Sequence, residues 1–428
     1  MDPLDRLPPL GEDRRAPWVL IGAGVVGLAC ALRLQAAGLK VLVLDREGVA
    51  AGASRGNAGA LAFSDVLPLA SPGILRQAPR WLLDPLGPLA LRPGYLLPML
   101  PWLWRFWRAS QPAQVERSAR AQAALLGLSA QAWPGLLDLA GARGQLRDGG
   151  NLHLYDDEAS WRAALPGWQQ RAGFGIAFEH LQGAEAVAHY QPGLAPQFRH
   201  ATFVPQWQTV DDPLALTCAL AKAFIARGGR LRRAEVRQLE PSPAGLSLQL
   251  AEGPPLQADR VLLCGGAWSH RLAACLGEPF PLETERGYNT TLPPGAFPLQ
   301  RQLTFCNHGF VVTPIAGGVR VGGAVEFAGL EAAPNYRRAD ALLAKAQRFL
   351  PTLQTQGGTQ WMGCRPSLPD SLPVLGASPT EPRLFYAFGH GHLGLTQAAA
   401  TAELALDWAL QRHSPLDLSP FAPQRFWD

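Results

Sequence analysis

The run Trp18-Val-Leu-Ile-Gly-Ala-Gly-Val-Val-Gly27 is the part of this chain that says most about its fold. Its first four residues are apolar and predict a short strand that is buried on both faces. Three glycines follow in the spacing G-x-G-x-x-G, at Gly22, Gly24 and Gly27, and a helical pattern begins inside that run. The run therefore predicts a strand, a tight turn and a helix in direct succession.

Glycines in this spacing are typical of a turn that binds the pyrophosphate of a dinucleotide. Gly22 allows the turn, Gly24 lets the pyrophosphate approach the backbone, and Gly27 lets the helix pack closely on the strand. The helix N-terminus favours anions because its N–H groups are unpaired and the helix dipole is positive there. A second apolar run at residues 40–45 ends in Asp45, where an acid can bind a ribose hydroxyl. An acid at this position disfavours a 2′-phosphate, so the residues favour FAD or NAD over NADP.

The composition is that of a folded protein with a large core. Of 428 residues, 47% are hydrophobic and 17% are charged, which excludes a disordered chain. The net charge of +4 is spread along the chain, whereas a nucleic-acid surface normally needs clustered positive charge. The six cysteines form no C-x-x-C pair, so we predict no metal site and a reducing compartment, the cytoplasm. The N-terminal residues 1–17 lack the basic and apolar regions of a secretory signal.

No segment of the sequence is expected to cross a membrane. Residues 95–108, however, combine leucine, tryptophan and phenylalanine with Arg105 and Arg108. Aromatic side chains beside arginine suit the interface between lipid headgroups and acyl chains. The interpretation that we favour from the sequence is the start of a helix that is buried or that contacts a second copy of the chain. We expect a soluble protein whose membrane contact, if it has one, is peripheral and on the cytoplasmic face of the inner membrane.

The order of elements predicts an α/β protein, α+β overall, in which an antiparallel-sheet substrate domain is inserted into a Rossmann-like nucleotide-binding domain. After the insertion, a helix capped by Asp212 with Pro213 at its first position leads back into buried strands. Alternating segments between residues 276 and 350 predict the antiparallel sheet. The nucleotide-binding domain is expected to comprise residues 16–90, 201–275 and 360–428, and the substrate-binding or cap domain residues 91–200 and 276–359.

Four further motifs follow the glycine turn. Residues 52–59, Gly-Ala-Ser-Arg-Gly-Asn-Ala-Gly, allow close approach of the backbone and offer two hydrogen-bonding side chains. Residues 264–270, Cys-Gly-Gly-Ala-Trp-Ser-His, follow a buried strand, and residues 362–376 contain Gly-Cys-Arg-Pro-Ser-Leu-Pro-Asp. Residues 388–397, Phe-Gly-His-Gly-His-Leu-Gly-Leu-Thr-Gln, lead into a helix whose N-terminal amides can stabilise negative charge on a reduced flavin.

Together the five motifs resemble those of the FAD-dependent D-amino-acid dehydrogenase family, within the larger group that contains the glycine and sarcosine oxidases. The resemblance runs from about residue 18 to residue 408 in the order that the family shows. It implies non-covalent FAD, a two-domain fold and oxidation of an amino acid at its α-carbon, including the branch that acts on D-proline or hydroxy-D-proline. The residues expected to contact FAD are Gly22, Ala23, Gly24, Val25, Val26, Gly27, Asp45, Arg46, Ser54, Asn57, Ala58, Gly59, Val236, Gly265, Trp268, Gly391, His392, Leu393, Gly394, Leu395 and Thr396.

The resemblance also implies residues that bind the substrate. Arg365 matches the position that binds the substrate carboxylate, and a planar guanidinium can do so through two parallel hydrogen bonds. Tyr288 and Arg286 belong to an Arg-Gly-Tyr motif on the substrate side and are expected to orient the substrate. A structural arginine under the flavin and a core tyrosine are the alternatives. For His308 we expect a loop residue, and a residue that reaches the pocket is the alternative.

The implied reaction is hydride transfer from the α-carbon to flavin N5, which requires a neutral amine and a carbon held close to the ring. The product imine hydrolyses to a 2-oxo acid and ammonia, or leaves as a cyclic imine. The residues identify no obligatory general base. A respiratory quinone or carrier is expected to take the electrons. An oxidase that uses O₂, a flavin-bearing subunit of a larger complex and a non-catalytic nucleotide-binding scaffold are the alternatives.

Overall fold

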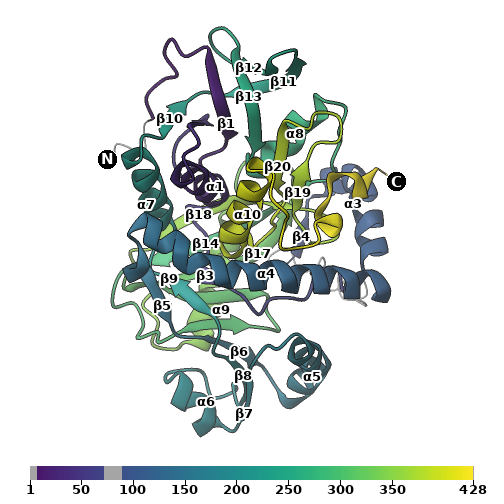
Figure 1. Cartoon of the computed structure of the whole chain (residues 1–428). Helices are drawn as coiled ribbons and strands as arrows, with labels where there is room; N and C mark the ends of the chain where they lie inside the picture. Colours follow the sequence, from purple (N-terminus) through teal and green to yellow (C-terminus); the bar gives the residue numbers. More distant parts are fainter. Residues whose placement is uncertain (1–6, 72–88, 428) are drawn as a thin grey trace.

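The glycine turn follows the central strand of an eight-stranded mixed sheet in the upper half of Figure 1. This computed structural model describes residues 7–71 and 89–427. Strand β1 (Arg15–Ile21) pairs in parallel with β2 (Val41–Asp45) on one side and with β13 (Leu256–Leu263) on the other. The remaining strands of this sheet are β10 (Arg230–Arg233), β11 (Val236–Ser242), β12 (Gly245–Leu250), β19 (Val374–Ala377) and β20 (Leu384–Phe388).

Three helices pack on one face of this sheet. Helices α1 (Val25–Ala36), α7 (Pro213–Ala226) and α10 (Gly394–Ala409) share one apolar core with the buried side chains of β1 and β2. The expected strand, turn and helix are therefore confirmed. Asp212 caps α7 as predicted, because its side chain accepts a backbone N–H of the first turn at 2.9 Å.

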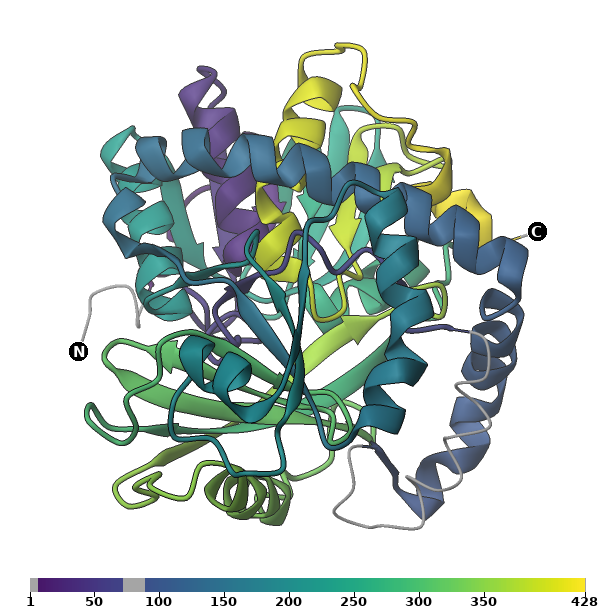
Figure 2. The ribbon, with the colours of Figure 1, turned by 90° about the horizontal axis from the view of Figure 1, so that it is seen from below.

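The position of helix α4 (Pro112–Ala140) differs from the one that the expected domain division implies. It belongs to the segment 91–200 that we assigned to the cap, yet it lies across α1, α7 and α10, as Figures 1 and 2 show. Leu125, Trp133 and Leu137 of α4 are part of the same core as α1. An amphipathic pattern predicts that a helix has an apolar face, but it does not identify the surface that this face will meet.

The second sheet forms the lower half of Figure 1 and has nine strands in the order β18-β14-β17-β16-β15-β6-β8-β7, with β4 beside β17. All neighbours are antiparallel except β15–β6 and β17–β4, so the expected antiparallel substrate domain is confirmed. Helix α9 (Arg337–Phe349) covers one face. The strands are β4 (Leu89–Leu91), β6 (Asn151–Tyr155), β7 (Glu179–Gln182), β8 (His200–Val204), β14 (Glu283–Leu292), β15 (Gln302–Phe305), β16 (Phe310–Ile315), β17 (Gly318–Phe327) and β18 (Thr359–Ser367).

Strands β8 and β18 lie, except for the first residue of each, in the ranges 201–275 and 360–428 that we assigned to the nucleotide-binding domain, but both pair in the second sheet. Three short strands that are far apart in the sequence form a small third sheet in the order β3-β9-β5. Within the described residues, no helix is long and apolar enough to span a bilayer. The other elements are β3 (Ala60–Leu61), β5 (Leu146–Asp148), β9 (Gln208–Val210), α3 (Leu96–Ala109), α5 (Glu158–Gly173), α6 (Ala184–Tyr190) and α8 (Ser269–Ala274).

Candidate active site

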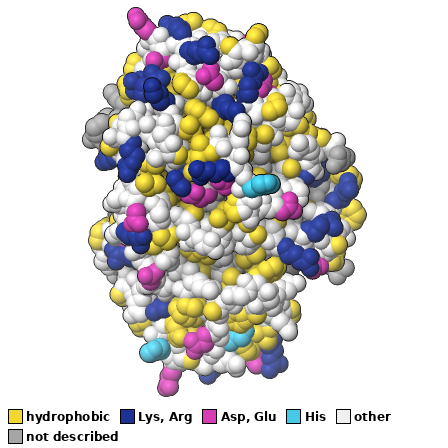
Figure 3. Space-filling model, in the orientation of Figure 1, with side chains coloured by type: hydrophobic (Ala, Val, Ile, Leu, Met, Phe, Trp, Pro, Cys, Tyr) yellow, Lys and Arg dark blue, Asp and Glu magenta, His cyan; other side chains and the backbone are white. Residues whose placement is uncertain are grey.

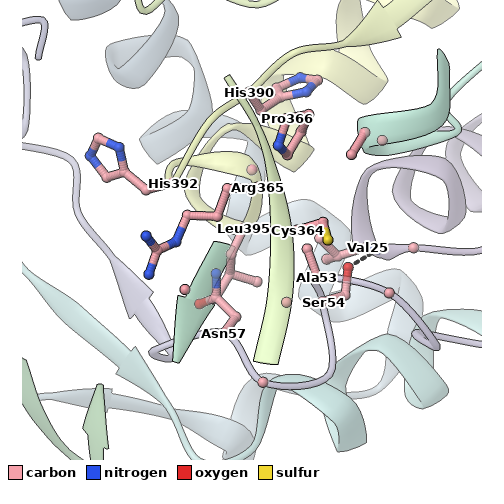
Figure 4. A pocket seen from close by; sticks show the side chains of 18 of the residues that line it. Val25, Ala53, Ser54, Asn57, Cys364, Arg365, Pro366, His390, His392 and Leu395 are labelled. Carbon is pink, nitrogen blue, oxygen red and sulfur yellow. Dashed lines mark hydrogen bonds between the residues drawn. The ribbon is translucent and has the colours of Figure 1, made fainter. Parts of the chain in front are cut away.

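A cavity of about 1020 Å³ lies between the two large sheets. Its walls are formed by the ends of β1 and β2, the loop 52–59, the turn before α10 and one face of the second sheet. Figure 4 shows Ser54 beside Val25 in one part of the cavity and Arg365 and His392 in another. The motifs that are scattered along the sequence therefore meet around one space.

The turn after β1 accepts only glycine at two positions. Gly22 has a φ of +110°, and a Cβ there would lie 2.4 Å from the carbonyl oxygen of Cys264. A Cβ on Gly27 would lie 2.0 Å from the carbonyl oxygen of Gly22, so α1 packs directly on the turn. The backbone of Gly22 and Gly24 lines the cavity, where a phosphate can approach the start of α1.

Asp45 ends β2 at the cavity wall and is held by backbone amides. Its carboxylate accepts hydrogen bonds from the N–H groups of Ala23 at 2.8 Å, Glu47 at 2.8 Å and Gly48 at 3.0 Å. Burial raises the pKa of Asp45, and the three amides oppose that shift. The carboxylate oxygens keep lone pairs for a further donor such as a ribose hydroxyl.

The loop 52–59 is attached to the start of α1. Ser54 Oγ accepts a hydrogen bond from the N–H of Val25 at 3.0 Å, drawn as a dashed line in Figure 4. Within the loop, Asn57 Oδ1 accepts from the N–H of Gly59 at 2.8 Å. Both side chains therefore shape the loop, and both also line the cavity.

Side chains of the second sheet hold the same loop from the other side. The amide of Asn289 donates to the carbonyl oxygen of Gly56 at 2.9 Å, and Arg320 donates to the carbonyl oxygen of Asn57. The ring of Trp361 packs on Gly56, where a Cβ would lie 2.1 Å from it. The position of the loop therefore depends on both domains.

One face of the second sheet forms a wall of the cavity. The register aligns six residues in one row across β18, β14, β17, β16, β15 and β6. Their sequence neighbours, such as Val312 and Val321, point to the opposite face and pack in the core that contains α9. In strand order, the six residues of the row are Trp361, Asn289, Gly322, Val311, Thr304 and His153.

Arg365 lies on the cavity face of β18, because it is four residues from Trp361. Its guanidinium donates to the carbonyl oxygen of Ala324 at 3.1 Å, and within the described residues it makes no ion pair shorter than 4 Å. Burial lowers the pKa of Arg365, while the charge of Glu285, opposite it on β14, raises it. A Cβ on Gly287 would lie 2.2 Å from a guanidinium nitrogen, so only glycine leaves room for Arg365 there.

Tyr288 and Arg286 point to the other face of β14, because side chains alternate along a strand. The hydroxyl of Tyr288 donates to Glu326 and accepts from the N–H of Asn335 at 3.1 Å, although the residue borders the cavity. Arg286 is fully buried, pairs with Glu326 at 3.2 Å and does not line the cavity. The geometry therefore gives Arg286 a structural contact in place of the expected contact with substrate, and it directs the phenol of Tyr288 away from Arg365.

The turn before α10 lines the cavity from residue 390 to residue 396. The hydroxyl of Thr396 accepts from the N–H of Ala62 at 3.0 Å and donates to the carbonyl oxygen of Ala60 at 3.2 Å. Thr396 therefore uses its side chain to hold β3, so that at this residue only the backbone is available to a ligand.

Most of the residues expected to contact a dinucleotide line this one cavity. Ala23, Gly27 and Gly59 do not line it and act through the shape of the turn and the loop. His308 also lies outside the cavity, where it pairs with Asp156 at 2.8 Å. The expected residues that line the cavity are Gly22, Gly24, Val25, Val26, Asp45, Arg46, Ser54, Asn57, Ala58, Val236, Gly265, Trp268, Gly391, His392, Leu393, Gly394, Leu395 and Thr396.

Some side chains that line the cavity were not predicted from the sequence, among them Arg320, Trp361 and His153. Arg320 occupies the centre of an alternating apolar strand, a pattern that normally indicates a solvent-facing charge; burial lowers its pKa. His153 makes edge contacts with Trp168 and Trp207, and burial lowers its pKa to about 3, so it is neutral. The alternation itself was the signal, but it does not tell which face meets a cavity.

Comparisons with known proteins agree with this geometry. The profile of a family described as DAO, FAD dependent oxidoreductase, matches residues 18–408. The chain belongs to this family. Its cofactor is FAD. An FAD-bound structure of L-α-glycerophosphate oxidase from Mycoplasma pneumoniae has the same fold, with a TM-score of 0.69 at 17% identity over 94% of this chain and 97% of that one.

Two relatives are similar to this FAD-dependent oxidoreductase over nearly their whole length. A D-amino-acid oxidase from Bradyrhizobium diazoefficiens is 34% identical, covering 95% of this chain and 98% of the relative. A D-amino acid dehydrogenase from Xylella fastidiosa is 31% identical over 91% of each chain. The structure of a glycine oxidase from Geobacillus kaustophilus has a TM-score of 0.76 at 22% identity, covering 96% of this chain and 99% of that one, which shows a common fold.

The residues of the cavity fit FAD. Two glycines whose Cβ atoms would collide with the backbone keep the turn open to a pyrophosphate. Asp45 is available to a ribose, and Val236 with Arg46 and Trp268 lines the same cavity. Arg46 lies 3.9 Å above the ring of Trp268, which holds that wall together. The turn before α10 would hold the flavin end through its backbone amides.

Proposed function

We propose that this chain oxidises the α-carbon of D-amino acids, including cyclic ones such as D-proline and hydroxy-D-proline, and that it works as a dehydrogenase. A respiratory quinone or carrier would then take the electrons. When bound, FAD supplies the acceptor for the hydride that leaves the α-carbon. The names of the relatives, a D-amino-acid oxidase and a D-amino acid dehydrogenase, support this substrate class.

The main support for the proposal is the state of Arg365. A partly buried guanidinium that makes no ion pair shorter than 4 Å within the described residues gives up part of its hydration without gaining a counter-charge, which is costly in free energy. A substrate carboxylate offsets that cost through two charge-assisted hydrogen bonds, and it fixes the orientation of the α-carbon at the same time. The guanidinium can lie at this position because Gly287 has no Cβ, which would be 2.2 Å from one of its nitrogens.

The rest of the wall positions the substrate and excludes water. Trp361 and Val311 contribute apolar surface to the row that faces the cavity. Gly322, which lies between them in the row, has no side chain to fill the cavity. A ring such as that of proline fits such a surface without leaving polar groups unpaired. The imine formed in the cavity leaves it as a cyclic imine or hydrolyses to a 2-oxo acid and ammonia.

A second candidate is an oxidase that returns the electrons to O₂. The relative from Bradyrhizobium, which is named an oxidase, favours it. The two candidates differ only in the acceptor, so they predict the same substrates but different products of reoxidation. Hydrogen peroxide in stoichiometric amount, with no rate increase from an added quinone, supports the oxidase.

Peripheral contact with a membrane is part of the proposal, and helix α3 is the candidate surface. The exposed apolar side chains of α3 recur every three or four residues, so they lie on one side of the helix. Arg105 and Arg108 flank them, and Figure 3 shows arginine and hydrophobic side chains intermixed along the side where α3 lies. A membrane with anionic headgroups matches both the apolar and the charged side chains. The exposed residues are Leu96, Leu97, Leu100, Trp104 and Trp107.

The test is anaerobic mixing of the FAD-bound protein with separate D- and L-amino acids, including D-proline and hydroxy-D-proline. We expect D-amino acids to bleach the visible absorbance of the flavin and L-amino acids to leave it unchanged. A quinone analogue and air are then added separately to measure which reoxidises the flavin faster. If no amino acid of either hand bleaches the flavin, the proposal is wrong.

A further inference from the structure

A histidine–aspartate pair lies in the part of the cavity that contains Arg365, and the proposed function has not yet used it. His392 Nε2 is 3.0 Å from Asp65 Oδ2. Both residues line the cavity together with Arg365. Figure 4 shows the imidazole of His392 on the same side of strand β18 as the guanidinium of Arg365.

Asp65 is held firmly and remains ionised. Its N–H donates to the carbonyl oxygen of Ala62 at 3.0 Å, and its own carbonyl oxygen accepts from the side chain of Gln122 at 2.8 Å. Arg171 of α5 lies 3.9 Å from its carboxylate. Burial alone would raise the pKa of Asp65, but the hydrogen bond from His392 and the charge of Arg171 are among the causes that together outweigh burial and lower it.

The carboxylate of Asp65 determines which nitrogen of His392 carries the proton. An ionised carboxylate only accepts hydrogen bonds, so a neutral His392 must carry its proton on Nε2 and its lone pair on Nδ1. Within the described part of the chain, Nδ1 has no hydrogen-bond partner. The side chain of His392 is 34% exposed. The pair therefore presents an oriented proton acceptor.

The reaction needs an acceptor for one proton of the substrate. An amino acid at neutral pH carries an ammonium group, which has no lone pair to support the loss of a hydride from the neighbouring carbon. The nitrogen must first lose a proton. Arg365 is a permanent cation, and the buried histidines His153 and His390 have pKa values of about 3, so they are weak acceptors.

We propose that His392, oriented by Asp65, accepts the proton that the ammonium group of the substrate loses before its α-carbon is oxidised. This inference rests on the proposed function. One N–H bond of the ammonium breaks, and its proton binds Nδ1 of His392. The Cα–H bond then breaks with both electrons going to the oxidised flavin, and the nitrogen lone pair forms the C=N bond of the iminium product. The imidazolium later returns its proton to water.

The charge around His392 favours this role. Asp65 stabilises the imidazolium that forms, and Arg171 prevents Asp65 from taking the proton itself. The titratable or charged groups that face His392 from the surrounding elements are Asp65 after β3, Arg171 of α5, His153 of β6, Glu285 of β14, Arg365 of β18 and His390 of the same turn.

The experiment compares wild type, His392→Gln, Asp65→Asn and the control His308→Gln, all loaded with FAD. His308 forms a histidine–aspartate pair with a similar N–O distance outside the cavity. Its variant therefore makes the same chemical change as His392→Gln, but away from the cavity. The rate of anaerobic flavin reduction by a D-amino acid is measured from pH 5 to pH 10. The second readout is the affinity for a carboxylate without an amine, tetrahydrofuran-2-carboxylate, followed by the shift of the flavin spectrum.

We expect the rate of flavin reduction by wild type to fall as the pH is lowered, with a pH dependence that fits the protonation of a single group. His392→Gln should lose that ionisation and reduce the flavin about 10²-fold more slowly at pH 7. Asp65→Asn should move the ionisation to lower pH, because the imidazolium loses its partner. Affinity for the amine-free carboxylate should change less than about threefold in every variant, and His308→Gln should behave as wild type.

Two outcomes overturn the inference and leave the proposed function intact. In the first, His392→Gln keeps the acid limb and a rate within about threefold of wild type. In the second, it loses affinity for the amine-free carboxylate, which would make His392 a carboxylate-binding residue. If His392→Gln fails to bind FAD, the shift expected of Asp65→Asn decides, and an unchanged ionisation there contradicts the proposal. A wild-type flavin that no amino acid reduces overturns the proposed function and this inference with it.

Discussion

At the level of single residues, Arg365 is the side chain whose surroundings call for a ligand. Its guanidinium is partly buried, is bound to one backbone carbonyl oxygen and is given space by Gly287. Tyr288 and Arg286 lie on the opposite face of β14, where both bind Glu326 of β17. The geometry therefore supports one of the three expected substrate-binding residues.

Replacing Arg365 with alanine should lower kcat/KM for D-amino acids by a factor of about 30 to 10³, with FAD still bound. The reason is that the substrate carboxylate would lose both charge-assisted hydrogen bonds in a partly buried site. Steady-state kinetics and the flavin spectrum measure the two effects. Arg162→Ala, which removes an exposed arginine of α5, is the control and should change neither. Unchanged kinetics of Arg365→Ala would exclude this residue from the site.

Two buried histidines should make the fold sensitive to acid. His153 and His390 have pKa values of about 3 in the folded chain, against 6.5 in an unfolded one, because burial disfavours their charged form. Between pH 6.5 and pH 3 the unfolded chain therefore binds more protons, and the free energy of unfolding falls as pH falls. Each histidine contributes a slope of about 1.4 kcal/mol per pH unit.

Urea unfolding at pH 7, 6 and 5 measures this dependence. His390→Gln should unfold with a smaller pH dependence than wild type, even if its free energy of unfolding at pH 7 is lower. A free energy of unfolding that is independent of pH over this range would contradict the assignment of neutral, buried imidazoles.

At the level of elements, the turn between β1 and α1 depends on the absence of side chains. A Cβ on Gly27 would lie 2.0 Å from the carbonyl oxygen of Gly22, so Gly27→Ala must push α1 away from β1. We expect this variant to lose FAD and to have a lower melting temperature. Gly127→Ala is the matched control, because Gly127 lies inside helix α4 and its Cβ would meet nothing within 4 Å. The control should be stabilised by about 1 kcal/mol.

Helix α3 carries the proposed membrane contact, and it can be tested without assaying activity. The double variant Leu97→Ser and Trp104→Ser should reduce binding to vesicles that contain anionic lipid by about tenfold or more, because each substitution removes a large apolar side chain from the interface. Co-sedimentation with such vesicles and with purely zwitterionic ones measures the effect. The control is Ile225→Ser, which changes an exposed apolar residue of α7 and should bind vesicles as wild type does. Equal binding by all proteins would contradict the proposal.

At the level of the whole molecule, the cavity exists only where the two large sheets meet. Asn289 and Arg320 of the second sheet hold the backbone of the loop 52–59, whose Ser54 is bound to the start of α1. The loop is therefore connected to both domains. A ligand that contacts it binds only the folded arrangement of the two sheets and so stabilises that arrangement.

Arg320→Met should weaken FAD binding by about tenfold or more, because a hydrogen bond from a charged donor to the carbonyl oxygen of Asn57 is lost. Quenching of flavin fluorescence on binding measures the dissociation constant. Arg348→Met, on helix α9 at the opposite face of the second sheet, is the control and should leave the constant unchanged. An unchanged constant in Arg320→Met would mean that the loop keeps its position without the hydrogen bond from Arg320.

The strand, turn and helix from Arg15 to Ala36, the acid at Asp45 and most of the motifs that line the cavity could be predicted from the amino-acid sequence. These features depend on backbone conformation and close contacts between residues near one another in the chain, so their spacing is visible in the sequence. The position of Arg365 on the cavity wall also followed from its motif.

Contacts between residues far apart in the chain could be found only in the folded molecule. The register of the second sheet directs Asn289 to the cavity and Tyr288 away from it, and packing brings His392 to Asp65, 327 residues earlier. The packing of the apolar face of α4 on α1, α7 and α10 is likewise a contact between distant segments. Local patterns specify that a strand or helix has two different faces, but the burial of distant segments against each other determines what each face contacts.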